Sequence, residues 1–100
     1  LDPPWGNSNA WLTTITLDSK LFPGAPKRIR EKLELSNIES RPVWKPLHLQ
    51  PVYKNAKKYL SGNADQIYSE GLCLPSGSTM SDEDVERVSS LILSSIKNVQ

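Results

Sequence analysis

The chain has 100 residues, of which 37% are hydrophobic and 23% are charged, and its 12 basic and 11 acidic residues give a net charge of +1. This length corresponds to one domain, and the hydrophobic content argues against a disordered chain. The balanced charge argues against a nucleic-acid partner, because binding to a phosphate backbone needs a surplus of basic residues.

Residues 9–18 predict the first strand. Trp11, Thr13, Ile15 and Leu17 alternate with residues that would lie on the opposite face, and the β-branched side chains favour a strand that is at least half-buried. Residues 19–24, with the sequence SKLFPG, predict a turn that leads into the next element.

Residues 25–37 predict a helix with a signal at each end. Pro26 suits the first helical position, and Asn37 can end the helix in the left-handed conformation. Ile29 and Leu33 are four residues apart, so they share one face that can be buried.

Three prolines interrupt the next stretch, RPVWKPLHLQP, which covers residues 41–51. The residue before a proline is kept out of the helical region, so residues 38–44 are expected to be extended. Because proline donates no backbone hydrogen bond, the whole stretch is expected to be irregular or to lie at a sheet edge.

The second half of the chain repeats the alternation of element types. Residues 63–71 predict a short helix closed by Gly71, and residues 72–75 predict a short apolar strand. A turn is expected at residues 76–79.

The clearest element is an amphipathic helix predicted over residues 81–99. Ser81 is a natural N-cap, and the three acidic residues after it place negative charge at the positive end of the helix dipole. An apolar stripe repeats every three or four residues and comprises Val85, Val88, Ile92, Ile96 and Val99. Lys97 lies at the other end, where a cation is favourable.

This order of elements predicts an α+β fold: a small, mostly antiparallel sheet with about three helices on one face. Residues 1–100 are expected to form one domain. No apolar run is long enough to span a membrane, and we expect neither a signal peptide nor a membrane partner. The first residue is not methionine, and we expect the chain to be a piece of a longer protein.

The sequence contains no strong catalytic motif: GxGxxG, GxxxxGK[ST], CxxC and HExxH are all absent. His48 and Cys73 could in principle form a nucleophile pair. However, Cys73 lies in an apolar run, where a free cysteine usually acts as a small hydrophobic residue. As the only cysteine it permits no internal disulfide and no thiolate metal cluster, and a reducing compartment such as the cytoplasm is the expected setting. The acidic residues at 82–84 are interpreted as a helix cap, and no metal site is predicted.

The proline-framed loop carries the candidate binding residues. Prolines restrict the backbone, and a stiff loop that presents Arg41, Lys45 and His48 suits an anion such as phosphate. Trp44 and Tyr53 offer flat faces for a sugar or a base. The competing interpretation is a crossing loop whose aromatic residues seal the sheet, whose cations are solvated and whose histidine lies at the edge of the core. Spacing alone favours this structural interpretation.

Three segments resemble, in this order and spacing, the carboxy-terminal part of the DegT/DnrJ/StrS family of pyridoxal-phosphate-dependent aminotransferases. They are residues 6–18, 38–53 and 71–88, and the block RPxWKPLHLQPxY is the most specific. This family acts on nucleotide-linked ketosugars. The LPSGS segment at residues 74–78 resembles the subgroup that aminates a UDP-linked 4-keto-6-deoxy sugar for surface glycans.

The resemblance implies the small carboxy-terminal domain of a fold-type I aminotransferase. The large domain would carry the Schiff-base lysine and most contacts to pyridoxal phosphate, so no catalytic residue is assigned here. Lys45 is not expected to be that lysine, and this chain alone is expected to be inactive and to bind no cofactor. The small domain would close the active site. Its expected substrate-binding residues are Arg41, Lys45, His48, Gln50 and Tyr53.

The partners implied are a nucleotide sugar, an amino donor (usually glutamate) and a second subunit of a homodimer. Arg41, Lys45 and His48 would favour the diphosphate, and Gln50 would hydrogen-bond the sugar. The alternative is a non-catalytic docking or dimerisation module that only closes the active site, in which Trp44 and Tyr53 pack against the large domain or a second subunit. Both roles can hold together.

Overall fold

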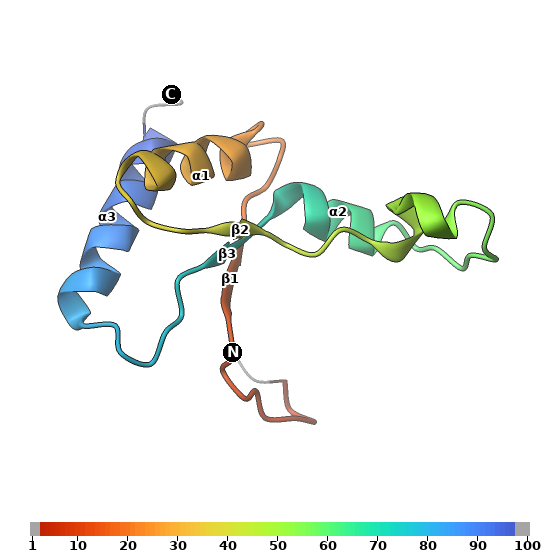
Figure 1. Ribbon diagram of the computed structural model, residues 1–100, viewed down its shortest axis with the longest axis horizontal. Helices are drawn as coiled ribbons and strands as arrows, with labels where there is room; N and C mark the ends of the chain where they lie inside the picture. Colours follow the sequence, from red (N-terminus) through yellow and green to blue (C-terminus); the bar gives the residue numbers. More distant parts are fainter. Residues whose placement is uncertain (1–2, 98–100) are drawn as a thin grey trace.

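Three helices and three short strands build the part of the chain that the computed structural model describes, residues 3–97 (Figure 1). In chain order the elements are β1 (Thr13–Thr16), α1 (Ala25–Leu35), β2 (Arg41–Pro42), α2 (Asn63–Glu70), β3 (Gly71–Leu74) and α3 (Asp82–Lys97). Two single 3₁₀ turns, Leu47–Leu49 and Pro51–Tyr53, lie between β2 and α2. The predicted α+β fold is confirmed. None of the described helices is long and apolar enough to cross a membrane.

The sheet is antiparallel and has the order β1-β3-β2, so the last strand in the sequence is the central one. Thr13 pairs with Leu74 on one side of β3, and Arg41 pairs with Cys73 on the other. Pro42 therefore lies on an edge strand, as the proline pattern predicted, where a missing N–H does not interrupt the ladder. The sheet is short along its strands because the central strand has only four residues.

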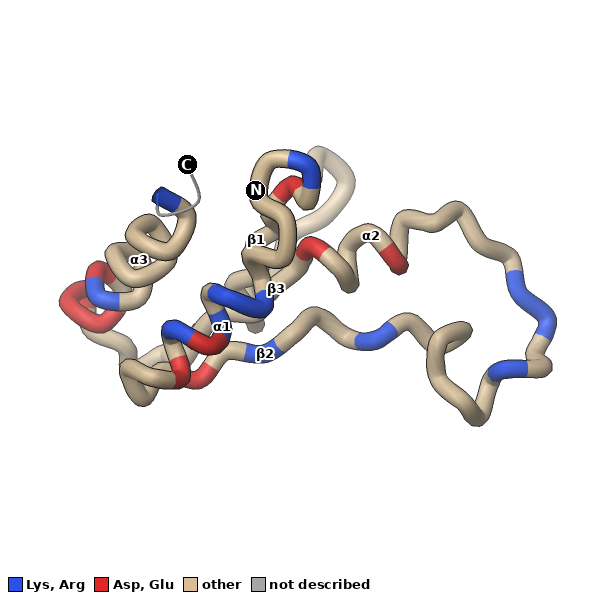
Figure 2. The backbone as a smooth tube through the Cα atoms, turned by 90° about the horizontal axis from the view of Figure 1, so that it is seen from above, with Lys and Arg blue, Asp and Glu red and all other residues tan. Residues whose placement is uncertain are grey.

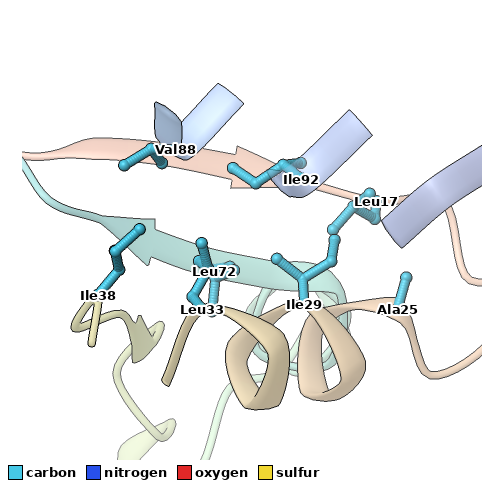
Figure 3. Close-up of a cluster of buried hydrophobic side chains, with 8 residues drawn as sticks. All are labelled: Leu17, Ala25, Ile29, Leu33, Ile38, Leu72, Val88 and Ile92. Carbon is cyan, nitrogen blue, oxygen red and sulfur yellow. The ribbon is translucent and has the colours of Figure 1, made fainter. Parts of the chain in front are cut away.

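Helices α1 and α3 cover one face of this sheet, and the space between them and the strands is filled by apolar side chains (Figure 3). Leu72 of β3 meets Ile29 and Leu33 of α1, all of them at most 1% exposed. The full cluster comprises Leu17, Ala25, Ile29, Leu33, Ile38, Leu72, Val88 and Ile92. Helix α2 precedes β3 directly and leads away from the other two helices, so two of the three helices form the predicted layer (Figure 1).

The ends of α1 follow the sequence signals closely. The helix begins at Ala25, after Gly24 in the left-handed conformation, so Pro26 is its second residue rather than its first. Asn37 is left-handed as predicted, with φ of 57°. The N–H of Ile38 donates to the Leu33 carbonyl at 2.9 Å, the hydrogen bond that defines a Schellman cap.

Helix α3 begins with a reciprocal cap. The N–H of Asp84 donates to Ser81 Oγ at 3.2 Å, and the N–H of Ser81 donates to Asp84 Oδ2 at 3.0 Å. Val88 and Ile92 of the predicted stripe are buried, whereas Val85, in the first turn, is 51% exposed. Val99 lies outside the described residues.

The predicted strand at residues 9–18 is too long. β1 covers Thr13–Thr16 only, because β3 offers four partners and the N–H of Thr13 already donates to Ser76 Oγ at 2.8 Å. Trp11 lies outside the strand and is exposed.

Residues 43–62 leave the sheet after β2 and return at α2 as a long projection, which we call the arm (Figures 1 and 2). The radius of gyration, 15.6 Å, exceeds the value of about 13 Å for a compact domain of this length. The largest dimension is 46 Å against a smallest of 26 Å. The arm therefore projects from a small body rather than packing onto it.

Candidate functional site

A contact between His48 and Asp65 ties the arm to α2. His48 Nε2 lies 2.9 Å from Asp65 Oδ1, and the two side chains are 14% and 43% exposed. Among the described residues, this is the one side-chain hydrogen bond that links the arm to a residue as far as 17 positions away. The imidazole is therefore held against a helix, although the segment that carries it is irregular.

The rest of the arm is shaped by local hydrogen bonds. Pro46 and Pro51 open the two 3₁₀ turns, where a missing N–H is tolerated. Gln50 Nε2 donates to the Lys45 carbonyl at 3.1 Å and thereby closes the first turn. The N–H of Tyr53 donates to the Gln50 carbonyl at 3.0 Å in the second turn. The amide nitrogen of Gln50 thus supports the arm itself.

A groove of roughly 920 Å³ runs beside β2. Its walls come from residues 37–45, the turn after β3 and the first turns of α3. Arg41 and Lys45 are the two predicted binding residues that line it, and His48, Gln50 and Tyr53 lie further along the arm. The apolar part of the lining includes Ile38, Pro42, Val43, Trp44, Cys73, Leu74, Pro75, Met80 and Val88.

Two arginines bring positive charge to this groove. Arg41 Nε donates to Glu39 Oε1 at 2.6 Å, but both side chains are more than 70% exposed, so this pair contributes little to stability. Arg87 Nη2 donates to the Ser36 carbonyl at 2.7 Å and caps the end of α1 from α3. Arg87 was not singled out from the sequence, because its contact with Ser36 spans 51 positions.

The structure shows whether the aromatic residues seal the sheet and whether Cys73 is a buried structural residue. The rings of Trp11 and Trp44 have centroids 5.7 Å apart at an angle of 42°, yet both residues remain more than 60% exposed, so they do not seal the sheet. Cys73 is buried, which confirms the structural interpretation. No interaction within residues 3–97 joins Cys73 to His48, so the nucleophile pair is not formed.

The arm is basic and apolar at the same time. Between Glu39 and Asp65 the chain has no acidic residue, and Figure 2 shows only basic positions along this stretch. The cations are Arg41, Lys45, Lys54, Lys57 and Lys58. The large exposed side chains of the arm are Trp44, Leu47, Leu49, Val52, Tyr53, Tyr59 and Leu60. Such a surface fits a partner that is partly apolar and partly anionic.

The sequence model of the DegT/DnrJ/EryC1/StrS aminotransferase family matches residues 2–93. The chain belongs to this family. The chain is 42% identical over 92 residues to EpsN of Bacillus subtilis (strain 168). EpsN is named as a pyridoxal phosphate-dependent aminotransferase. That alignment covers 88% of this chain and 23% of EpsN.

Two GDP-perosamine synthases are also similar. The one from Caulobacter vibrioides is 31% identical over 78 residues, which are 78% of this chain and 21% of that protein. The one from Vibrio cholerae is 32% identical over 83 residues, which are 82% of this chain and 22% of that protein. The chain thus spans less than a quarter of the length of these curated relatives.

Solved structures of aminotransferases share the fold. TlmJ from Streptoalloteichus hindustanus superimposes with a TM-score of 0.78 at 24% identity, covering 97% of this chain and 25% of TlmJ. The sugar aminotransferase Spr1654 from Streptococcus pneumoniae, in its PMP form, gives a TM-score of 0.72 at 21% identity, covering 89% of this chain and 23% of that one. The chain therefore has the same fold as the matching parts of these two structures.

The described residues do not fit pyridoxal phosphate on their own. A site for this cofactor needs a lysine with an activated amine and an acidic or basic partner for the pyridine nitrogen. Lys45, the lysine in the groove, is exposed. The two acids there are engaged elsewhere, Asp84 by Ser81 and Glu39 by Arg41. No step of the cofactor's chemistry is therefore assigned to these residues.

Proposed function

We propose that this chain is the small carboxy-terminal domain of a pyridoxal-phosphate-dependent aminotransferase. The enzyme would transfer an amino group, usually from glutamate, to a nucleotide-linked 4-keto-6-deoxy sugar in the biosynthesis of surface polysaccharide or glycoprotein glycans. The observation that carries this proposal is the family match over residues 2–93. The names of the two GDP-perosamine synthases support a nucleotide-linked sugar as substrate. The enzyme is proposed to be a cytoplasmic homodimer.

The proposed substrate-binding residues divide by position. Arg41 and Lys45 line the groove and carry charges suited to a diphosphate. His48, Gln50 and Tyr53 lie along the adjoining arm, nearer to where a sugar would extend from the diphosphate. These five residues form the proposed substrate side of the site, and the cofactor side would belong to the remainder of the enzyme.

A docking role is the second candidate, and the exposed arm favours it. Val52 and Tyr59 are 79% and 83% exposed, and Trp44 is 63% exposed. Seven large apolar side chains on one segment are more than a solvated loop needs. In this arrangement the arm packs against the large domain or a second subunit and thereby closes the active site.

The reaction class is tested with the enzyme that contains this chain. It would be incubated with pyridoxal phosphate, glutamate and either a UDP-linked or a GDP-linked 4-keto-6-deoxy sugar, and the products analysed by mass spectrometry. An amino sugar that forms only when both glutamate and the keto sugar are present supports the proposal. Glutamate conversion to 2-oxoglutarate with simple keto acids but with neither nucleotide sugar would contradict it.

The two roles of the arm are separated by a pair of substitutions. His48→Ala is expected to raise the Michaelis constant for the nucleotide sugar, while the half-reaction with glutamate stays nearly unchanged. Trp44→Ala is expected to weaken assembly, measured as a shift toward smaller species in sedimentation velocity. Lys27→Ala, at an exposed position of α1 outside the arm and the groove, is the control for non-specific effects. An equal loss in both half-reactions for His48→Ala would indicate a structural histidine.

A further inference from the structure

We infer that Asp65 is a positioning residue that holds His48 with its proton on Nε2, so that Nδ1 accepts a hydrogen bond from a hydroxyl group of the sugar. The inference deepens the proposed function and rests on it for the identity of the ligand. The arrangement of the two side chains stands independently of that function. It also reassigns His48 from the diphosphate to the sugar.

The tautomer follows from the chemistry of the contact. A carboxylate can only accept hydrogen bonds, so at 2.9 Å from Asp65 Oδ1 the hydrogen must be on His48 Nε2. In a neutral imidazole the other nitrogen then carries a lone pair and acts as an acceptor. Nδ1 makes no hydrogen bond to a described residue and is not among the buried polar atoms that lack a partner. Nδ1 therefore keeps some solvent exposure, and its lone pair has no partner among the described residues.

The same contact disfavours a diphosphate at His48. In the neutral ring, a phosphate oxygen that approached Nδ1 would meet a lone pair, and the negative charge of Asp65 lies on the far side of the ring. Arg41, Lys45 and Arg87 are the cations that line the groove, and Glu39 there pairs only with the exposed Arg41. The charged part of the ligand thus fits the groove, and a neutral hydroxyl fits His48.

Asp65 is suited to orient the ring because it belongs to a regular helix. It lies in the first turn of α2, where a carboxylate is favoured by the helix dipole. The arm around His48 consists of 3₁₀ turns and irregular chain, which alone would fix the ring poorly. A side chain anchored by a neighbour on a rigid element holds its orientation better than one on a loop.

The geometry is tested first by nitrogen-15 NMR on this chain, whose single histidine gives an unambiguous signal. In mildly alkaline buffer, we expect His48 to carry its proton almost entirely on Nε2. Asp65→Ala should shift the ring to the tautomer mixture of an unpaired imidazole, and Asn63→Ala, two residues earlier, should not. A proton on Nδ1 in the wild-type chain, or an unchanged mixture in Asp65→Ala, would overturn the inference.

The ligand is tested in the enzyme, with UDP as a probe that carries the nucleoside and the diphosphate but lacks the attached keto sugar. His48→Ala should raise the Michaelis constant for the UDP-linked keto sugar about 3- to 10-fold, the equivalent of one neutral hydrogen bond, and leave inhibition by UDP unchanged. Asp65→Ala, which removes the acceptor for the Nε2–H, should act in the same direction. Equal weakening of UDP, or no effect on either, would overturn the sugar contact.

These two experiments separate the inference from the proposed function. If the enzyme aminates no nucleotide sugar, the proposed function fails, and the NMR result still decides whether Asp65 sets the tautomer of His48. If amination occurs but the proton lies on Nδ1, the function stands and the inference fails.

Discussion

Val43 packs so closely on Gly71 that a β-carbon at Gly71 would lie 2.4 Å from Val43 Cγ2 and 2.5 Å from the Ile67 carbonyl oxygen. Gly71 connects α2 to β3, and Val43 is the first residue of the arm. The φ angle of Gly71 is −92°, which any residue can adopt, so the requirement for glycine here is one of space rather than of backbone conformation. This contact fixes where the arm leaves the sheet.

Gly71→Ala is therefore expected to lower the free energy of unfolding by about 1–3 kcal/mol, the usual cost of forcing an extra group into a packed site. The carbonyl of Ile67 belongs to a helix and cannot yield easily. Urea denaturation followed by circular dichroism would measure the loss. Gly77→Ala is the control, because the nearest atom to its added carbon would be Thr79 Oγ1 at 4.0 Å. Equal effects at both glycines would contradict the steric argument.

The core prediction concerns two neighbouring residues of α3. Ile92 is buried against α1 and the sheet, whereas Leu93 is 57% exposed. Ile92→Ala should lower the free energy of unfolding by about 2–5 kcal/mol, because a large side chain is lost from a packed cluster. Leu93→Ala should change it by less than about 0.5 kcal/mol. Thermal unfolding of both variants measures these changes. A loss of stability in Ile92→Ala as small as that in Leu93→Ala would contradict the burial of Ile92 between α3, α1 and the sheet.

The cap of α1 makes a third prediction. Asn37 is left-handed, a conformation that costs a residue with a β-branched side chain about 1–2 kcal/mol. Asn37→Val should therefore destabilise the chain by about that amount, and Asn37→Gly should not, because glycine adopts the conformation freely. Both variants keep the backbone hydrogen bond of Ile38 to Leu33, so the difference between them reports the conformation alone. Equal stabilities in urea titrations would argue against a left-handed Asn37.

Features set by neighbouring residues could be predicted from the sequence. Helices α1 and α3 were expected because their apolar spacing, Asn37 and the Ser81 cap are all local signals. The burial of Cys73 followed from its apolar neighbours. The sheet edge at Pro42 followed from the missing N–H of proline. In each case the physical cause lies within a few residues of the feature.

Features set by distant contacts could not be predicted in this way. The first strand is short because β3, more than fifty residues later, has four residues to offer. Asp65 was read only as part of a helix, since nothing in its spacing from His48 announces a contact across 17 positions. The length of the arm was also missed, because proline explains why residues 41–51 are irregular but not why residues 52–62 stay exposed.

Two carboxylates give the fold its expected sensitivity to acid. Hydrogen bonds from the hydroxyl and then the backbone N–H of Ser19 lower the pKa of Glu70, and those from the backbone and then the hydroxyl of Ser81 lower the pKa of Asp84. A carboxylate whose pKa is lower in the folded than in the unfolded state stabilises the fold above its ordinary pKa. That contribution is lost as the pH falls through the lowered pKa.

The chain should therefore lose stability as the pH falls below about 4, where unfolded carboxylates begin to take up protons. Glu70→Gln and Asp84→Asn should each make the urea midpoint less dependent on pH over this range. Glu83→Gln, at an exposed position beside Asp84, should leave the slope unchanged and serves as the control. If the urea midpoint of Glu70→Gln or Asp84→Asn depended more steeply on pH than that of the wild-type chain, the lowered pKa assigned to that carboxylate would be wrong.

The last prediction is that this chain alone forms no specific adduct with pyridoxal phosphate. An aldehyde reacts weakly with any exposed amine, but a lasting adduct needs one lysine held in a site. Lys32 is partly buried, and its Nζ donates a hydrogen bond to Ser94 Oγ at 2.7 Å. Lys45 is exposed, and the acidic residues of the groove are paired with other residues, so none is placed to bind the pyridine nitrogen. After incubation and dialysis, absorption spectra should show no stoichiometric Schiff-base band, and mass spectrometry after borohydride reduction should find low, scattered labelling. A single lysine labelled to completion would place the cofactor site within these residues and contradict the assignment of the chain to the substrate side of the enzyme.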